Sequence, residues 1–317
     1  MKALPQLIIL CLGFSIISFG QTNIPEPFLK EIISQFPNVR DAALIADGNE
    51  VYFTVQSYLG ELSAIVVSRK ENNEWANPEV AGFSGQFHDL EPFLSHDGLK
   101  LYFVSNRPFN KNDSVVKDYD IWYVQRNDFK SSWSAPVNLG DPVNTKDNEF
   151  YPCVTKSGNL YFTCDGKNSK GKDDIFVCKY DDGKYQLPVS VSDSINTEGY
   201  EFNAFVSPDE NFMIYTCYNR EGGLGSGDLY ISYHEGNGKW TQSGNLGKEI
   251  NSAQMDYCPF VDFKNRMMIF TSKRSQLNTS ADTRFHTTGL SHEFNKYSNG
   301  QSRLYQVKFN YDFDKTK

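Results

Sequence analysis

The sequence predicts an all-β fold, a single β-propeller with five four-stranded blades. The first observation is an internal repeat, in which a turn precedes an apolar–aromatic segment. A period of roughly 40–60 residues with strand-like content is typical of a propeller, where each repeat forms one sheet. The other observations are an edge-strand motif and the complementary content of the two chain ends. The clear copies place Asp47-Gly48 before Val51-Tyr52-Phe53, Asp97-Gly98 before Leu101-Tyr102-Phe103, and Ser157-Gly158 before Leu160-Tyr161-Phe162; the weaker ones place Asp209-Glu210 before Met213-Ile214-Tyr215 and Lys264-Asn265 before Met268-Ile269-Phe270.

Each repeat aligns over four strands, which we name A to D from the centre of the ring outward. Strand B is the apolar–aromatic segment itself. Strand C follows a variable loop and is rich in β-branched and aromatic residues, as short strands are. We expect strand A to begin near Ala42, Pro92, Pro152, Ala204 and Pro259, and strand C to cover 63–67, 120–122, 174–176, 228–230 and 303–305.

Strand D is marked by an aromatic residue with proline three places later. Proline cannot donate to a sheet ladder, so it belongs on an edge strand. There it also hinders edge-to-edge aggregation. The copies are Trp75 with Pro78, Trp133 with Pro136 and Tyr185 with Pro188, while Trp240 with Ser243 keeps only the aromatic residue.

The two ends of the chain complement one another. Residues 22–40 contain Pro27 and Ile33-Ser34, which fit a strand D and its linker with no strands A to C before them. The last repeat ends with a strand C at 303–310 and lacks the strand D motif. We therefore predict that the N-terminal strand completes the fifth blade, which removes an exposed sheet edge. Six blades are a weaker alternative, since another blade would need about 40 more residues.

Residues 1–20 have the features of a secretory signal peptide, with Lys2 before an apolar run at 7–17 and a small-residue site before Gln21. The run is shorter than the ~20 residues that a membrane span needs. We expect an exported protein without a transmembrane segment, either periplasmic, associated with the outer membrane or secreted. The propeller domain would cover 21–317, and we expect it to be a monomer. The formal charge of −8 disfavours nucleic acid as a partner, because an acidic surface repels phosphates.

Five cysteines remain after the predicted cleavage, and an odd number leaves at least one thiol unpaired. None has the spacing of a CxxC motif. Cys164 and Cys178 fall on neighbouring predicted strands, so a disulfide between them is one possibility and free thiols are the other. The five are Cys153, Cys164, Cys178, Cys217 and Cys258.

The repeats resemble the WD40-like, TolB-type propeller family of exported bacterial proteins. The resemblance rests on Glu91-Pro92 with Ser95-His96-Asp97-Gly98, on residues 102–107, on residues 133–140 and on Gly227-Asp228-Leu229-Tyr230. It extends over nearly all of residues 22–310. It implies a non-catalytic propeller of the periplasm or cell envelope that binds other proteins.

Four acids stand at equivalent places where a linker enters strand A, around one mouth of the predicted channel: Asp89, Glu149, Glu201 and Asp256. Oxygen ligands suit hard cations, so one hypothesis is a divalent cation in the channel. The alternative is that each acid accepts backbone or arginine hydrogen bonds and joins blade to blade. Recurrence at equivalent positions favours the structural role, and we expect no other cofactor.

Two further sets of polar residues suggest specific contacts. Asp120, Asp174 and Asp228 open strand C, and Arg107 and Arg274 close strand B, which predicts Asp–Arg pairs across the B–C loop. Arg284, His286 and His292 share the polar loop 275–301, which favours either a solvated loop or an anion or metal site.

Two functions remain open on the sequence alone. The first is a non-catalytic scaffold that presents its long loops, 106–119 and 275–301, to a protein or glycan, because loops on a rigid scaffold carry recognition. The second is a carbohydrate-active enzyme, a glycoside hydrolase or lyase, that uses two of the channel-mouth acids. Unequal surroundings would be needed to separate the pKa values of a catalytic pair. We favour the scaffold.

Overall fold

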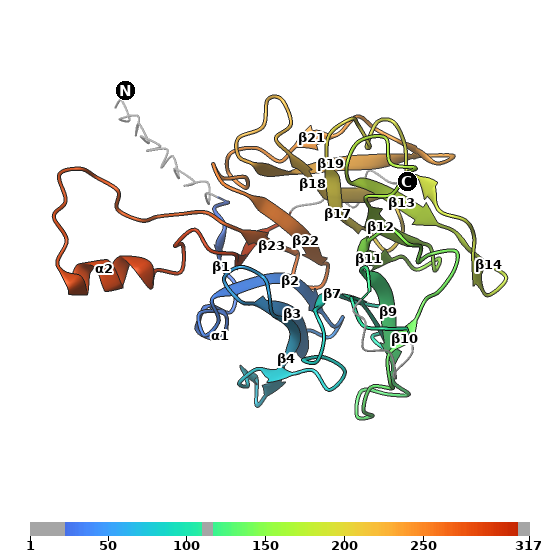
Figure 1. Cartoon of the computed structure of the whole chain (residues 1–317), viewed down its shortest axis with the longest axis horizontal. Helices are drawn as coiled ribbons and strands as arrows, with labels where there is room; N and C mark the ends of the chain where they lie inside the picture. The colour runs from blue at the N-terminus through green and yellow to red at the C-terminus, as the bar shows by residue number, and fades with distance from the viewer. Residues whose placement is uncertain (1–22, 110–116, 310–317) are drawn as a thin grey trace, which may run out of the picture.

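The computed structural model describes residues 23–109 and 117–309 of the chain, and these form a five-bladed β-propeller (Figure 1). Each blade is an antiparallel sheet with strands A to D in the predicted order. The predicted fold class and blade number are therefore confirmed. The predicted signal peptide, residues 1–20, lies outside the described residues.

The two inner strands of every blade correspond to the predicted strands A and B. Strand A is β2 (Asn38–Leu44), β7 (Asp89–Leu94), β11 (Glu149–Val154), β17 (Glu201–Val206) and β22 (Asp256–Asp262). Strand B is β3 (Glu50–Gln56), β8 (Lys100–Ser105), β12 (Leu160–Cys164), β18 (Phe212–Tyr218) and β23 (Met267–Ser272).

The two outer strands differ in length, because strand D is only two residues long in each blade. Strand C is β4 (Ser63–Glu71), β9 (Asp120–Gln125), β13 (Asp174–Cys178), β19 (Gly227–Gly236) and β24 (Arg303–Lys308). Strand D is β6 (Glu79–Val80), β10 (Val137–Asn138), β16 (Val189–Ser190), β21 (Gly244–Asn245) and β1 (Glu26–Pro27).

The aromatic–proline motif lies directly before strand D, as predicted. In three blades the aromatic residue sits on or beside a short hairpin that extends strand C, and the chain then turns back to the outer edge. The hairpin strands are β5 (Glu74–Trp75), β14 (Tyr180–Asp181) with β15 (Lys184–Tyr185), and β20 (Lys239–Trp240).

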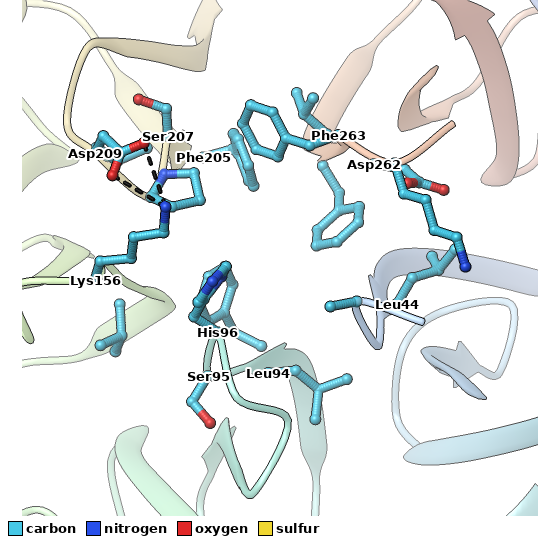
Figure 2. Close-up of a pocket in the computed structure, with 18 of the residues that line it drawn as sticks. Leu44, Leu94, Ser95, His96, Lys156, Phe205, Ser207, Asp209, Asp262 and Phe263 are labelled. Carbon is cyan, nitrogen blue, oxygen red and sulfur yellow. Dashed lines mark hydrogen bonds and ion pairs between the residues drawn. The ribbon is translucent and has the colours of Figure 1, made fainter. Parts of the chain in front are cut away.

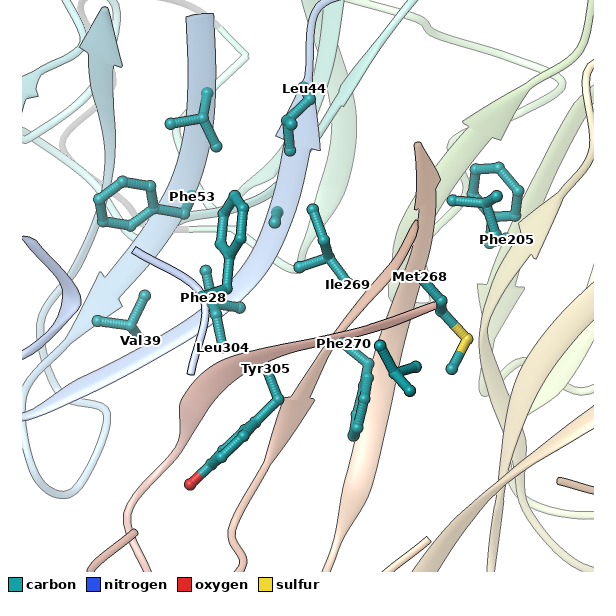
Figure 3. Packing of buried hydrophobic residues seen from close by; sticks show 14 of the residues in the cluster. Phe28, Val39, Leu44, Phe53, Phe205, Met268, Ile269, Phe270, Leu304 and Tyr305 are labelled. Atoms are coloured by element: carbon teal, nitrogen blue, oxygen red, sulfur yellow. The ribbon is translucent and has the colours of Figure 1, made fainter. Parts of the chain in front are cut away.

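The ring is closed by its N-terminal strand, as the chain ends predicted. Strand β1 pairs antiparallel with β24, with Pro27 opposite Tyr305. The short helix α1 (Lys30–Ile33) follows and buries Ile33. Figure 3 shows Phe28 among side chains of β2, β3, β23 and β24, all within one buried apolar cluster. The first and last blades therefore share a core.

The propeller has two different faces. Asp89 at the start of strand A lies opposite Ser105 at the end of strand B. The B–C loops and the linkers from strand D to the next strand A therefore lie on one face, which we call the loop face. The A–B turns lie on the opposite face, which we call the turn face. The B–C loop 275–301 forms an arm that carries α2 (Thr287–Phe294) and projects from the ring (Figure 1).

The five cysteines of the described residues are buried free thiols. Cys164 and Cys178 do lie on paired strands, but Cys164 is opposite Asp174 and Cys178 is opposite Leu160. This register separates the two thiols, so the possible disulfide is not formed. Neither helix in the described ranges is long and apolar enough to span a bilayer.

Candidate functional site

The four predicted channel-mouth acids each open a strand A on the loop face. Their residues are at most 1% exposed, so no carboxylate faces solvent. Each accepts a hydrogen bond of 2.7–2.8 Å from a hydroxyl group of the preceding linker. The acids therefore hold the linkers between blades. The donor–acceptor pairs are Ser84 with Asp89, Thr145 with Glu149, Thr197 with Glu201 and Ser252 with Asp256.

Arginines at the end of strand B reach three of these acids. Each guanidinium also donates to a linker carbonyl, that of Phe83, Ile195 or Ile250. Two acceptors thus fix one planar group, which makes a buried charge tolerable. The nitrogen–oxygen distances are 2.6 Å for Arg107 and Asp89, 2.7 Å for Arg220 and Glu201, and 3.0 Å for Arg274 and Asp256.

The predicted Asp–Arg pairs across the B–C loop are therefore wrong. Each arginine side chain turns back toward the linker, where an acid and a backbone carbonyl both accept hydrogen bonds from its guanidinium. The strand C aspartates instead accept hydrogen bonds from nearby neutral donors, so they need no cation as a partner. Asp120 accepts from the Asn138 amide, Asp174 from the Lys170 backbone N–H, and Asp228 from the Leu224 backbone N–H and the Asn245 amide.

Glu149 breaks this pattern, because Gly166 stands where the other blades have arginine. A Cβ at Gly166 would lie 2.6 Å from Oδ2 of Asp147 and 3.1 Å from Sγ of Cys164, so the place is already filled. Glu149 Oε2 is buried without a hydrogen-bond partner. Burial raises the pKa of Glu149 to about 8, against the hydrogen bonds from Thr145. Glu149 is thus a buried acid whose surroundings differ from those of its repeat equivalents.

The centre of the channel contains a polar cluster that the sequence analysis missed. Every strand A has a register shift near its start, after the third residue of β2 and after the second residue of the other four, and the next residue adopts a positive φ of 52–59°. This bulge re-aims the backbone, as bulges do in barrel rims and active sites. The five residues are Asp41, Glu91, Tyr151, Asn203 and Cys258. A fixed spacing in the sequence could have identified these residues, because each lies two residues after Val39 or after one of the four mouth acids.

Arg40 is the cation of this cluster. Its guanidinium lies 2.9 Å from Asp41, 2.6 Å from Glu91 and 3.4 Å from Sγ of Cys258, which join three blades. Its guanidinium carbon also lies 5.2 Å from the centre of the Tyr257 ring. Burial raises the pKa of Glu91 to about 7, while Arg40 acts in the opposite direction. Both central carboxylates are therefore already engaged by the protein.

Two aromatic side chains, those of Tyr119 and Phe150, pack together close to the polar cluster around Arg40 and Glu91. The rings of Tyr119 and Phe150 lie 5.2 Å apart, and the Tyr119 hydroxyl is 3.3 Å from Nδ1 of His88. Burial raises the pKa of Tyr119, and the negative charge of Glu91 acts in the same direction. In the described ranges no three His, Cys, Asp or Glu side chains are arranged to hold a metal ion, so the divalent cation stays a prediction.

The predicted binding-loop residues are spread along the arm. Arg284, His286 and His292 are all exposed, and His292 has an acidic neighbour in Glu293, 3.9 Å away. His292 also lines a polar notch of about 760 Å³ between α2 and the N-terminal segment, together with Lys30. The arm is fastened at its base, where Gln276 N donates to the Ser298 carbonyl.

The loop face also carries most of the strongly exposed large apolar side chains. They come from the B–C loops of four blades and from one linker, and they are 38–86% exposed. Recognition surfaces commonly combine such side chains with rigid support. They are Tyr58, Leu59, Leu62, Phe109, Tyr200, Tyr218, Leu224, Leu290 and Phe294.

No protein-family model and no curated protein matches this chain. Solved structures do match over most of it. An endo-arabinase from Bacteroides thetaiotaomicron is 12% identical with a TM-score of 0.55, and the match covers 93% of this chain and 99% of that one. An alpha-L-arabinofuranosidase from Podospora anserina, solved with cellotriose, is 11% identical with a TM-score of 0.53, covering 92% and 95%.

TolB from Acinetobacter baumannii is also similar, at 13% identity and a TM-score of 0.45. That match covers 85% of this chain but 54% of TolB, so the chain spans about half the length of that protein. At such identities the similarity to the endo-arabinase and the arabinofuranosidase is one of fold alone.

Proposed function

We propose that this chain is an exported, non-catalytic propeller whose loop face binds another protein in the cell envelope. The observation that carries the proposal is the set of nine exposed apolar side chains on the loop face. Apolar side chains on loops of a rigid ring supply the contact area that protein interfaces use. The export part rests on the signal-peptide features of residues 1–20.

The state of the carboxylates supports binding over catalysis. Asp41 and Glu91 face the guanidinium of Arg40, all four mouth acids accept from linker hydroxyls, and three of the four also face an arginine. A glycosidase needs two carboxyl groups that reach the substrate on opposite sides of the scissile bond. Here those groups are buried and already hydrogen-bonded.

The test is affinity capture from the native cell envelope, followed by mass spectrometry. The bait is the wild type beside a variant with Leu59→Ser and Phe294→Ser, which removes two side chains that are 86% and 63% exposed. A matched control is Leu187→Ser with Val189→Ser, which are 75% and 52% exposed at the outer edge of a blade. We expect a protein partner that the control keeps and the loop-face variant loses. Capture of glycan alone, or equal capture by both variants, would contradict the proposal.

A carbohydrate-active enzyme is the second candidate, and one observation favours it. Glu149 has unequal surroundings and a pKa raised to about 8 by burial, as a catalytic acid would need. The neighbours include glycoside hydrolases with the same fold. A glycan-hydrolysis screen of wild type, Glu149→Gln and Glu201→Gln separates the candidates. Activity that Glu149→Gln abolishes would favour the enzyme, and no activity in any substrate class would leave binding.

A further inference from the structure

The turn face contains an apolar pocket at the end of the channel opposite the acids (Figure 2). Its cavity is about 440 Å³. Each of the five strands A contributes at its C-terminal end, so the pocket lies on the axis of the ring. Pockets of roughly 300–1,000 Å³ with apolar walls and few polar groups are the usual form of small-molecule sites. The residues contributed are Leu44, Phe93, Val154, Phe205 and Phe260.

Phenylalanine rings form a substantial part of the apolar wall. Phe205 lies edge-on to Phe260, with ring centres 5.6 Å apart, and is tilted against Phe263 at 6.2 Å. Phe93 adds a half-buried ring from another blade. A further ring can pack against such a wall edge to face, because edges and faces of opposite partial charge then meet.

Charged side chains at the rim already have hydrogen-bond partners in the protein, as Asp262 has in Asn265. Lys156 lies 3.1 Å from Asp209, and Lys264 donates to the Asp47 carbonyl at 2.7 Å, across the rim. A charged ligand would have to displace one of these partners. His96 is exposed at the rim, and Figure 2 shows its ring beside the opening. The rim therefore suits an uncharged ligand with a hydrogen-bonding group.

The pocket is separate from the loop face. Arg40, Asp41 and Glu91 fill the middle of the channel with a buried ionic layer. An apolar molecule packed against that layer would keep water from its charges without giving them a partner, and such burial of charge is costly. The A–B turns line the pocket's rim, so the pocket opens on the turn face.

We propose that this pocket is a binding site for a small, uncharged aromatic molecule. The site is independent of the loop-face partner, and it requires no chemical step. The ligand's ring packs against the phenylalanines that different blades contribute to the wall, and its polar group remains at the rim near His96.

The test is fluorescence titration of the full chain with N-phenyl-1-naphthylamine, an uncharged aromatic probe whose emission rises in apolar surroundings. Val154→Phe, which fills the pocket, should weaken binding at least five-fold. The matched control is Val189→Phe, the same change at a 52% exposed position of the outer strand D. It should bind like the wild type. Thermal melting of both variants checks that they are folded.

A second measurement locates the probe. Phe260→Trp places an indole in the pocket wall, and energy transfer from it to the bound probe should exceed that from the four native tryptophans, none of which lines the pocket. Equal affinity of Val154→Phe and Val189→Phe, or no added transfer, would overturn the proposal. So would binding that appears only after removal of residues 310–317, because the pocket would then belong to the chain's own segment.

Discussion

The guanidinium of Arg40 lies 2.6 Å from the carboxylate of Glu91, although the two residues belong to strands A of neighbouring blades. Arg40 also contacts Cys258 of the last blade at 3.4 Å. One side chain therefore joins the first, second and fifth blades at the axis of the ring.

We expect Arg40→Leu to destabilise the fold strongly. The change leaves Asp41 and Glu91 buried without their cation, and breaking a buried pair on one side costs on the order of 3–5 kcal/mol. Urea denaturation at neutral pH measures the loss. The double variant with Glu91→Leu should lose less than the sum of the single variants, because the second change removes one stranded charge. A loss below about 1 kcal/mol for Arg40→Leu would contradict a buried role for this pair.

Stability should fall as pH rises through the neutral range. Burial raises the pKa of Glu149 from 4.5 to about 8, so between these values the folded state binds more protons than the unfolded state. Unfolding then becomes easier with rising pH. The raised pKa of Glu91 acts in the same direction. Denaturation curves from pH 5 to pH 8 should show a steeper decline for wild type than for Glu149→Gln. Parallel pH profiles would rule out Glu149 as a source.

The same conservative change in two blades should have opposite effects. At pH 8, Glu149→Gln removes a carboxyl group that has no arginine, so stability should be unchanged or higher. Asp256→Asn leaves the largely buried guanidinium of Arg274 without its carboxylate partner. The free energy of unfolding should fall by on the order of 2 kcal/mol, the contribution of a hydrogen bond to a charged group. Chemical denaturation of both variants in one buffer makes the comparison. Equal losses would mean that arginine pairing does not distinguish these acids.

Closing the ring depends on Phe28, which is 7% exposed and packs with the last blade. Phe28→Ala should cost about 3–5 kcal/mol, as for other buried Phe to Ala changes. Ile24→Ala is a suitable control, because Ile24 is 67% exposed and just outside β1. It should change stability by less than about 0.5 kcal/mol. Similar melting temperatures for the two variants would show that the closure contributes little.

The arm can be removed if its base is kept. Helix α2 buries no residue, but Tyr297 is 8% exposed and its hydroxyl donates to the Phe28 carbonyl. Replacing residues 278–295 with a short Gly-Ser turn should shift the melting temperature by less than about 2 °C. The same variant should capture less of the loop-face partner. Full capture without the arm would place recognition on the remaining loops.

Much of the fold could be read from local patterns. Strand order and the edge prolines follow from motifs that recur with a regular spacing, and the completing strand follows from the motifs at the two chain ends. Each of these motifs depends on residues close in sequence. The contacts within the candidate site were harder to predict from the sequence. Each of the four acids opens a strand A, but the predicted Asp–Arg pairs were wrong, because Arg107 turns toward Asp89 and not toward Asp120. Direction of a long side chain is set by the linker that packs beside it.

The sequence by itself determined the five blades, the closure by residues near Pro27 and the loop lengths, because strand content and turn residues act locally. Only the tertiary structure decided which groups meet at the axis. The bulge in each strand A brings Asp41, Glu91 and Cys258 around Arg40, and the opposite ends of the same strands enclose the aromatic pocket. Glu91 and Cys258 are 51 and 218 residues from Arg40 in the chain, so these contacts are set by ring closure and long-range packing.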